Sequence, residues 1–469
     1  MTCSIKSGKS KKPVHIEKMR SRAFFLVLLI LSTFACKSAP PVHETASMAA
    51  PESPKQPQNQ LVVVSWDGFR PEFYSSTRYK TPHLRALIHR GAHATGLVPV
   101  YPTLTYPNHT TMITGVLPKR HGVISNTIFN WDNGPTQDWY WNASFIQVPT
   151  LWQRARESDL KTAALGWPVS VGAPVDWLVP EIFSTGTGPD VWELTRRNMQ
   201  GGLVQELSND TTIQGFTDDE QHDHWMTEAA LSILKRHAPN LLLLHLTQGD
   251  HAQHQTGRDS EATQKAVEHL DSWIGKIADS LDLNRTTLIV LGDHGFKDYT
   301  RELRLNSLLR EKGWITVENG RVSDWKAIAH PGGGGAVIYV RDKAMNAKVM
   351  RFLREHSKGR YMIVPRSRLD KLGAYPEALC AIEPVEGVSF SGKFDGPLLG
   401  PPLSHGAKRG NHGYLPSQSK LFSGFIAVGP GIRPGKDLGV IRMIDVGPTL
   451  ADALKIKLPS AQGKAINLK

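Results

Sequence analysis

Cysteine is scarce in this chain, with three residues in 469. Cys3 and Cys36 lie close to the N-terminus and Cys380 stands alone, so the folded part cannot build a disulfide framework. A lone buried thiol is the expected state of Cys380. The chain is long enough to bury a core without disulfides, and its 40% hydrophobic and 21% charged residues are typical of a globular protein.

Long hydrophobic runs are also missing. An apolar stretch over residues 23–31 is too short to span a bilayer. It follows a segment rich in Lys and Arg and is closed by the small residue Ala35, which is the pattern of a secretory signal peptide. We therefore predict a signal peptide over residues 1–35 and an exported protein.

Cys36 directly follows Ala35, as the lipid-attachment cysteine does in bacterial lipoproteins, although Thr33 and Phe34 differ from the usual residues there. Two outcomes stay open: lipidation of Cys36, which would attach the chain to a membrane, or simple cleavage near Ala35. Residues 36–60 are rich in Pro, Ala, Ser and Gln without apolar periodicity, so we predict a flexible tether. Both outcomes place the protein in the periplasm or on a membrane of a bacterium.

The excess of positive charge over the folded part is small. The formal net charge is +12, but residues 1–35 contribute +6 of it. The other +6 is spread over a large domain and forms no basic stripe interleaved with aromatic residues. This small positive excess suits a small phosphate-bearing substrate, and we expect no specific binding of nucleic acid. The sequence carries no signal for an oligomeric state.

Internal repeats and heptads are absent, and strands alternate with helices instead. Buried strands are expected at residues 61–66, 162–165, 241–246, 287–291 and 424–428, and helices at 151–157, 219–236, 261–279 and 444–454. This order predicts an α/β fold with a doubly wound, mostly parallel central sheet and helices on both faces. The main domain is predicted over residues 61–460, with an inserted cap subdomain at about 301–404, where the alternation breaks.

Acidic and histidine residues follow the expected strands. Asp67 ends the first strand, Asp250 and His254 follow the strand at 241–246, and Asp293-His294 follows the strand at 287–291 between two glycines. Residues placed in this way meet at the carboxyl ends of the strands. If its segment turns helically, Asp250 faces the same metal as His254. Each pair alone also fits a polar turn or a chance spacing.

Thr105 lies in the segment Pro-Thr-Leu-Thr-Tyr-Pro-Asn-His over residues 102–109. Pro107 marks the expected first turn of a helix, so Thr105 is expected just ahead of a helix N-terminus, which favours an anion. A sixth ligand could come from His405 or His412, and the local sequences around these two histidines are too similar to decide between them. One hydroxyl nucleophile and six metal ligands are what a two-metal phosphoryl-transfer site needs.

Two further features are expected to carry no chemistry. His222, Asp223 and His224 lie in a charged helix start and are interpreted as a solvated face. The glycine run 332–335 lacks the Lys-Ser/Thr of a phosphate-binding loop and is interpreted as a mobile hinge.

The run over residues 102–115, with His121-Gly-Val and Asn126 after it, resembles the ectonucleotide pyrophosphatase/phosphodiesterase family of the alkaline phosphatase superfamily. The resemblance extends from residue 61 to the last helix and implies an alkaline-phosphatase-like fold with two zinc ions. One zinc would be held by Asp250, His254 and His412. The other would be held by Asp67, Asp293 and His294, with the Thr105 hydroxyl on it.

The resemblance also implies that Thr105 forms a phospho-threonine and that the Asn126 amide contacts a nonbridging phosphate oxygen. It favours His412, in Gly-Asn-His-Gly, as the last ligand. Backbone N–H groups near Thr105 and Tyr106 are expected to bind charge that develops on phosphorus. The chain departs from the family at Gln248-Gly249, where many members carry Glu-Pro, and this departure puts the substrate preference in doubt.

The predicted function is therefore that of an extracytoplasmic, zinc-dependent phosphodiesterase or nucleotide pyrophosphatase. The alternatives are a phosphomonoesterase, which usually needs an added cation that residues 166–172 do not offer, and a phosphonate hydrolase. A sulfatase is disfavoured because the nucleophile lies in no Cys/Ser-x-Pro-x-Arg context. A surface lipoprotein that only binds ligands is the alternative from another class, and the intact ligand set argues against it.

Overall fold

The structure is a computed structural model in which the chain divides into two units, Met1–Glu52 and Ser53–Lys469. It describes residues 57, 59–183, 191–208 and 218–469, without the side chains of Ser208, Asp219 and His405. The predicted signal peptide and nearly all of the predicted tether lie outside the described residues. No helix within the described ranges combines the length and apolar character needed to cross a bilayer.

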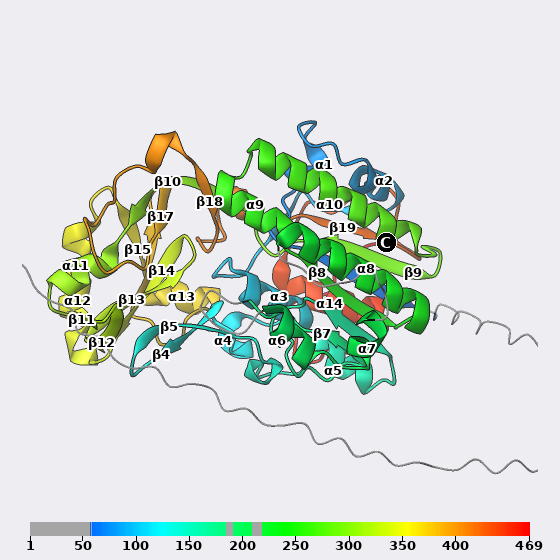
Figure 1. The fold of residues 1–469 in the computed structure, drawn as a ribbon, viewed down its shortest axis with the longest axis horizontal. Helices are drawn as coiled ribbons and strands as arrows, with labels where there is room; N and C mark the ends of the chain where they lie inside the picture. Colours follow the sequence, from blue (N-terminus) through cyan, green and yellow to red (C-terminus); the bar gives the residue numbers. More distant parts are fainter. Residues whose placement is uncertain (1–56, 58, 184–190, 209–217) are drawn as a thin grey trace, which may run out of the picture. The chain divides into compact units, whose positions relative to one another are not determined.

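An eight-stranded sheet forms the centre of the second unit, in the order β20-β2-β19-β9-β1-β8-β6-β7 (Figure 1). The five parallel strands, in sheet order, are β9 (Thr286–Leu291), β1 (Gln60–Trp66), β8 (Leu241–Leu246), β6 (Thr162–Leu165) and β7 (Trp177–Val179). Antiparallel to β9 runs β19 (Phe425–Val428), beyond which lie β2 (Ala92–His93) and β20 (Lys436–Asp437). The predicted mostly parallel sheet is confirmed.

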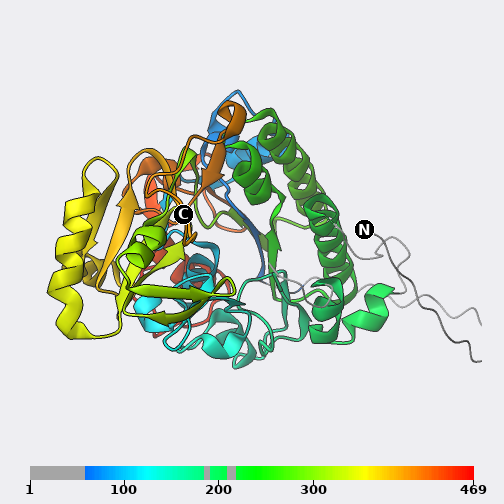
Figure 2. The same cartoon turned by 60° about the vertical axis from the view of Figure 1, so that its left-hand side comes forward.

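The central strands are apolar on both faces because helices cover both faces. Val62 and Val64 of β1 face a core shared with α2 (Pro82–Arg90), α8 (Asp219–His237) and α10 (Glu261–Asp279). Leu61 and Val63 face a second core shared with α3 (Thr105–Thr114), α5 (Leu151–Arg156) and α14 (Val446–Ala453). Figure 2 shows the long green helices side by side along one side of the central strands. This alternation is the doubly wound arrangement.

The region at residues 301–404 is more regular than the sequence suggests. Its four-stranded antiparallel sheet has the order β13 (Ala327–Gly332), β14 (Gly335–Val340), β16 (Cys380–Pro384) and β15 (Tyr361–Pro365). The sheet contacts α11 (Leu305–Glu311), α12 (Asn346–Ser357) and α13 (Arg366–Leu372), and a hairpin is formed by β11 (Ile315–Glu318) and β12 (Arg321–Trp325). These elements share their own core, which includes the buried free thiol of Cys380. The sequence predicts only a helix near residue 305 and a strand at residues 336–340 in this region, which correspond to α11 and β14. Most of the other elements are too short to show a clear period in the sequence.

A second small sheet brings the ends of this region back to the central sheet. β10 (Lys297–Leu303) starts just after the Asp293-His294 turn, and it pairs with β17 (Gly387–Phe390) and β18 (Arg409–Asn411). In this pairing Lys297 lies opposite Asn411. The register therefore places His412 beside Asp293 and His294, although more than a hundred residues separate them in sequence.

Candidate active site

Two groups of potential metal ligands lie beyond the carboxyl ends of β9, β1 and β8. The first group consists of Asp250, His254 and His412, and the second consists of Asp67, Asp293 and His294. Within each group the ligand atoms lie within 4.8 Å of one another. The structure thus brings the six residues together in the two predicted sets, and metal binding itself stays a prediction.

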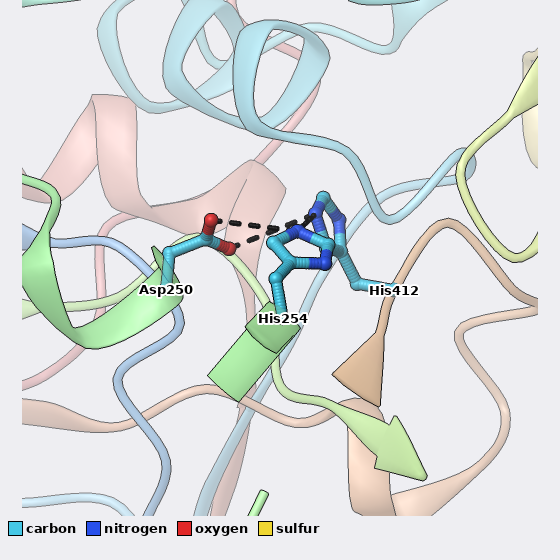
Figure 3. A group of neighbouring side chains, drawn as sticks. All are labelled: Asp250, His254 and His412. Carbon is cyan, nitrogen blue, oxygen red and sulfur yellow. Dashed lines mark hydrogen bonds and ion pairs between the residues drawn. The ribbon is translucent and has the colours of Figure 1, made fainter. Parts of the chain in front are cut away.

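Two residues of the first group, Asp250 and His254, lie on α9 (Gln248–Thr256). The sequence predicted that they face the same metal if this segment is helical, and the segment is helical. The two side chains lie one turn apart and point toward His412 (Figure 3). His254 Nε2 lies 3.4 Å from Asp250 Oδ2, and His412 Nε2 lies 3.7 Å from Asp250 Oδ1.

The two histidines of this group turn nitrogen lone pairs toward each other. His254 Nδ1 lies 3.0 Å from Gly410 O and His412 Nδ1 lies 2.9 Å from Thr103 O, so each Nδ1 carries the hydrogen that a carbonyl accepts. Burial lowers the pKa of His254 to about 4 and holds that of His412 well below its usual value, so both rings are neutral. Their Nε2 atoms lie only 3.1 Å apart. A cation between these lone pairs and Asp250 would relieve the repulsion, and two imidazoles with one carboxylate fit zinc.

The second group lies where the chain leaves β1 and β9. His294 Nε2 is 3.1 Å from Asp293 Oδ2 and 3.3 Å from Asp67 Oδ1. The glycines around Asp293-His294 permit close approach, because a Cβ on Gly292 would lie 2.6 Å from Phe69 Cβ and one on Gly295 would lie 2.3 Å from a backbone oxygen.

Three carboxylates, of which Asp67 and Asp293 are buried and Asp250 is partly buried, give the site an excess of acidic groups. Burial and the charges on Asp250 and Asp293 raise the pKa of Asp67 well above its usual value. Burial, with the charge on Asp293, raises the pKa of Asp250 to about 7. Burial alone would lower the pKa of His294, but the carboxylates outweigh it and raise that pKa to about 9. One oxygen on each acid has no hydrogen-bond partner among the described residues, so the site fits two divalent cations.

Thr105 is the first residue of α3, so the helix begins two residues earlier than Pro107 suggests. Pro107 takes the third helical position, where the backbone N–H has no intrahelical partner in any case. Thr105 Oγ1 lies 3.4 Å from His294 Nε2, and the residue is 7% exposed. The hydroxyl therefore lies against the second ligand group.

Asn126 lies beside Thr105, the candidate nucleophile, and is held by Tyr106, the residue that follows Thr105. Asn126 Oδ1 accepts a hydrogen bond of 3.0 Å from the Tyr106 N–H, so the amide Nδ2 is the side that can donate to a ligand. In this structure the Tyr106 N–H donates to Asn126, and the role of the N–H groups near Thr105 and Tyr106 in binding charge on phosphorus stays a prediction.

The glycine run is a tight hairpin turn that contacts the site, not a hinge. It joins β13 to β14, and the Gly334 N–H donates to His412 O. A Cβ on Gly334 would lie 2.0 Å from the Tyr414 ring, so only glycine allows this approach. The turn thereby supports the backbone that presents His412. The alternative ligand, His405, lies in the turn Ser404–Gly406, and its side chain is outside the described part of the structure.

The departure at Gln248-Gly249 has a packing explanation. Gly249 is buried in the first turn of α9, and a Cβ there would lie 2.2 Å from Trp66 Nε1. A residue with a side chain would push the ligand helix away from β1. The glycine is therefore required by the neighbouring tryptophan.

Asp223 supports the helix that carries Asp250 and His254, a role that its local sequence did not indicate. Its assignment to a solvated face is wrong, because the residue is 0% exposed. Its carboxylate accepts hydrogen bonds from the N–H groups of Thr247 (2.8 and 2.9 Å) and Gln248 (2.8 Å) at the start of α9. The signal was present as helical periodicity, because the buried positions of α8 include Asp223, Met226, Ala230 and Ile233.

We expect Asp223→Asn to weaken zinc binding at the first ligand group by about 10- to 100-fold, as loss of a partner behind a metal ligand typically does. The amide cannot accept all three hydrogen bonds that position α9. A zinc titration against a competing chelator measures the effect. Asp218→Asn is the matched control, because Asp218 caps the same α8 from an exposed position and its carboxylate accepts a hydrogen bond from the Gln221 N–H (2.9 Å). Equal affinities in the two variants would contradict this role for Asp223.

Comparison with known proteins places the chain in a family. Residues 61–415 match the family model described as type I phosphodiesterase / nucleotide pyrophosphatase. The chain is 26% identical over 263 residues to ectonucleotide pyrophosphatase/phosphodiesterase family member 3 of Rattus norvegicus, which covers 54% of this chain and 27% of that protein. It is 23% identical over 413 residues to family member 1 of Homo sapiens, covering 84% of this chain and 40% of that protein. The chain thus spans less than half the length of these relatives.

Solved structures show the same fold. Murine ectonucleotide pyrophosphatase/phosphodiesterase 5, an inactive variant in complex with AMP, superposes with a TM-score of 0.63 at 19% identity, over 87% of this chain and 98% of that chain. The human protein 5 gives a TM-score of 0.63 at 19% identity, over 86% and 97%. The predicted fold class is confirmed. Because the family match covers well over half of its residues, the chain belongs to the type I phosphodiesterase / nucleotide pyrophosphatase family.

Proposed function

We propose that this chain is a zinc-dependent phosphodiesterase or nucleotide pyrophosphatase that uses Thr105 as a covalent nucleophile. The observation that carries the proposal is the position of Thr105 Oγ1, 3.4 Å from His294 Nε2 and against a group of three protein ligands. Three protein ligands leave a fourth position for an oxygen, which is typical of catalytic zinc sites.

The two ligand groups fit one zinc ion each. Asp250, His254 and His412 would hold the first, and Asp67, Asp293 and His294 would hold the second. Bound zinc would supply Lewis-acid stabilisation of the attacking and leaving oxygens and would favour the deprotonated hydroxyl.

Thr105 and Asn126 carry the steps that belong to the chain itself. Thr105 Oγ1 gives up its proton to solvent and bonds to phosphorus, while the bond from phosphorus to the leaving oxygen breaks and that oxygen takes up a proton from solvent. Asn126 Nδ2 donates to a nonbridging oxygen, because its Oδ1 is fixed by the Tyr106 N–H. Water then attacks the phosphorus of the phospho-threonine and releases the Thr105 hydroxyl together with the phosphorylated product.

The charges around the site favour a diester or pyrophosphate over a monoester. A monoester carries about two negative charges near neutral pH and a diester carries one. Residues 166–172 contain no Lys or Arg, and Lys393 lies 3.0 Å from Glu302, which occupies its charge. The AMP bound to the murine relative supports a nucleotide as the substrate class.

We further propose that the chain is exported, through a signal peptide at residues 1–35, to the periplasm or to a membrane of a bacterium as a lipoprotein attached at Cys36. Metabolic labelling with a radioactive fatty acid tests the attachment. Label in the wild type and none in Cys36→Ser is the expected result, and an unlabelled wild type would leave simple cleavage near Ala35 as the outcome.

Removal of metal tests the proposed activity. Protein stripped with a chelator should lose hydrolysis of a nucleoside-5′ p-nitrophenyl ester, and zinc should restore it as about two ions per chain bind, one for each ligand group. Full activity in the stripped protein would contradict the proposal. Zinc binding without hydrolysis of any diester would indicate a ligand-binding protein instead.

A further inference from the structure

Strand β8 places one histidine among leucines. Its sequence is Leu-Leu-Leu-Leu-His-Leu, and His245 is 0% exposed. It lies on the same face of the strand as Leu241 and Leu243, which pack in the core on the α3 side. Neither the proposed ligand sets nor the nucleophile uses it. A buried imidazole requires partners for both ring nitrogens, so its neighbours indicate what it does.

Both nitrogens of His245 face carboxylates. Nδ1 lies 2.6 Å from Glu181 Oε2 and 3.1 Å from Gly166 O. Nε2 lies 3.3 Å from Asp67 Oδ2, an ion-pair distance without the alignment of a hydrogen bond. The other oxygen of Asp67, Oδ1, lies 3.3 Å from His294 Nε2 in the second ligand group. Glu181, His245 and Asp67 therefore form a chain of contacts that ends at this group.

Asp67 differs from the other acid of its group in how it is held. Asp293 Oδ1 accepts hydrogen bonds from the N–H groups of Gly68 (3.1 Å) and His294 (2.9 Å), so the backbone fixes that carboxylate. Asp67 Oδ1 has no hydrogen-bond partner among the described residues, and the charges of Asp250 and Asp293 repel it. His245 is thus the group outside the ligand set that is placed to orient the Asp67 carboxylate.

We infer that His245 and Glu181 are positioning residues for the second ligand group. Glu181 orients the imidazole, and His245 holds Asp67 so that its Oδ1 faces His294. The inference rests on the proposed function, because it concerns the zinc ion that this group would hold. Partners of this kind typically change metal affinity by about 10- to 100-fold when they are removed.

The test is a zinc titration of the full chain against a competing chelator, which resolves two dissociation steps in the wild type. His254→Ala removes a ligand of the first group and so identifies the step that belongs to the second. We expect His245→Gln to weaken that second-group step by about 10- to 100-fold and to leave the first-group step in place. Glu181→Gln should act on the same step by a smaller factor, since it leaves the imidazole present.

Two variants separate positioning from general destabilisation. His330→Gln removes another buried histidine, which is 1% exposed and lies in β13 of the four-stranded antiparallel sheet, and should leave both steps unchanged. Asp223→Asn should weaken the first-group step and leave the second-group step in place, whereas His245→Gln should do the reverse. If His245→Gln does not fold, Glu181→Gln decides the matter, because Glu181 is 13% exposed and tolerates an isosteric amide better.

The inference would be overturned, with the proposed function intact, if His245→Gln weakened both steps equally. It would also be overturned if neither His245→Gln nor Glu181→Gln weakened the second-group step. A wild-type protein that binds no zinc would overturn the proposed function and this inference with it. A wild type that shows two steps and hydrolyses diesters, with the second-group step unchanged in both variants, would leave the proposed function standing.

Discussion

Thr105→Ala should lower kcat for diester hydrolysis on the order of 10³-fold or more while zinc content stays near that of the wild type. The side chain supplies the oxygen that bonds to phosphorus, and its Oγ1 lies 3.4 Å from His294 Nε2 of the second ligand group. The three carboxylates and three histidines of the ligand groups are untouched by the change. Steady-state kinetics and elemental analysis of the same preparation measure both quantities.

Two variants control for this result. Thr114→Ala removes a hydroxyl from the last turn of the same helix, where Oγ1 donates to Thr110 O (2.6 Å), and should leave kcat close to the wild-type value. Thr105→Ser keeps a hydroxyl and should retain a measurable part of the rate. A Thr105→Ala protein with near-normal kcat would mean that another group attacks phosphorus.

His412→Ala should lower the zinc content from two ions to one per chain and reduce kcat/KM on the order of 10²- to 10³-fold, because a metal at this position contributes several kcal/mol of transition-state stabilisation. The variant leaves His254 and Asp250 as a pair, which is too few ligands for a stable zinc site. His405→Ala is the matched control, because His405 also lies between a polar residue and a glycine in the same part of the chain. It should keep both zinc ions. Loss of zinc in His405→Ala alone would mean that the last ligand is His405.

The parts of the fold that could be predicted were those whose signal is local. β1, β8 and β9 are continuous apolar runs, and α10 begins at a Ser260 cap whose Oγ accepts from the Thr263 N–H (3.0 Å). Their bounds agree with the sequence within a residue. The acids after these strands could be found because parallel strands deliver their carboxyl ends to one edge of the sheet.

The parts that could not be predicted depend on partners far apart in sequence. Asp223 binds the start of α9, so its charge pointed to the surface until the fold supplied its partners. His245 lies in a strand that was predicted to be buried, but its partner Glu181 is 64 residues away in sequence and no local pattern points to it. The Tyr106 N–H was assigned to the substrate because nothing local shows that Asn126 accepts from it. Helices and strands of the cap region were missed for the related reason that their apolar positions are set by packing on one another.

The most direct test of the account is a comparison of kcat/KM for bis-p-nitrophenyl phosphate and p-nitrophenyl phosphate with the zinc-loaded protein. Both substrates release the same phenolate, so the leaving group is held constant. They differ at the other position on phosphorus, which is an aryl ester in the diester and a second charged oxygen in the monoester. That charge would face Asp67, Asp250 and Asp293 without a cation from residues 166–172 to offset it. The account predicts a higher kcat/KM for the diester. A higher kcat/KM for the monoester would contradict it and would mean that a cationic side chain such as Lys408 or Arg409 reaches the phosphoryl group.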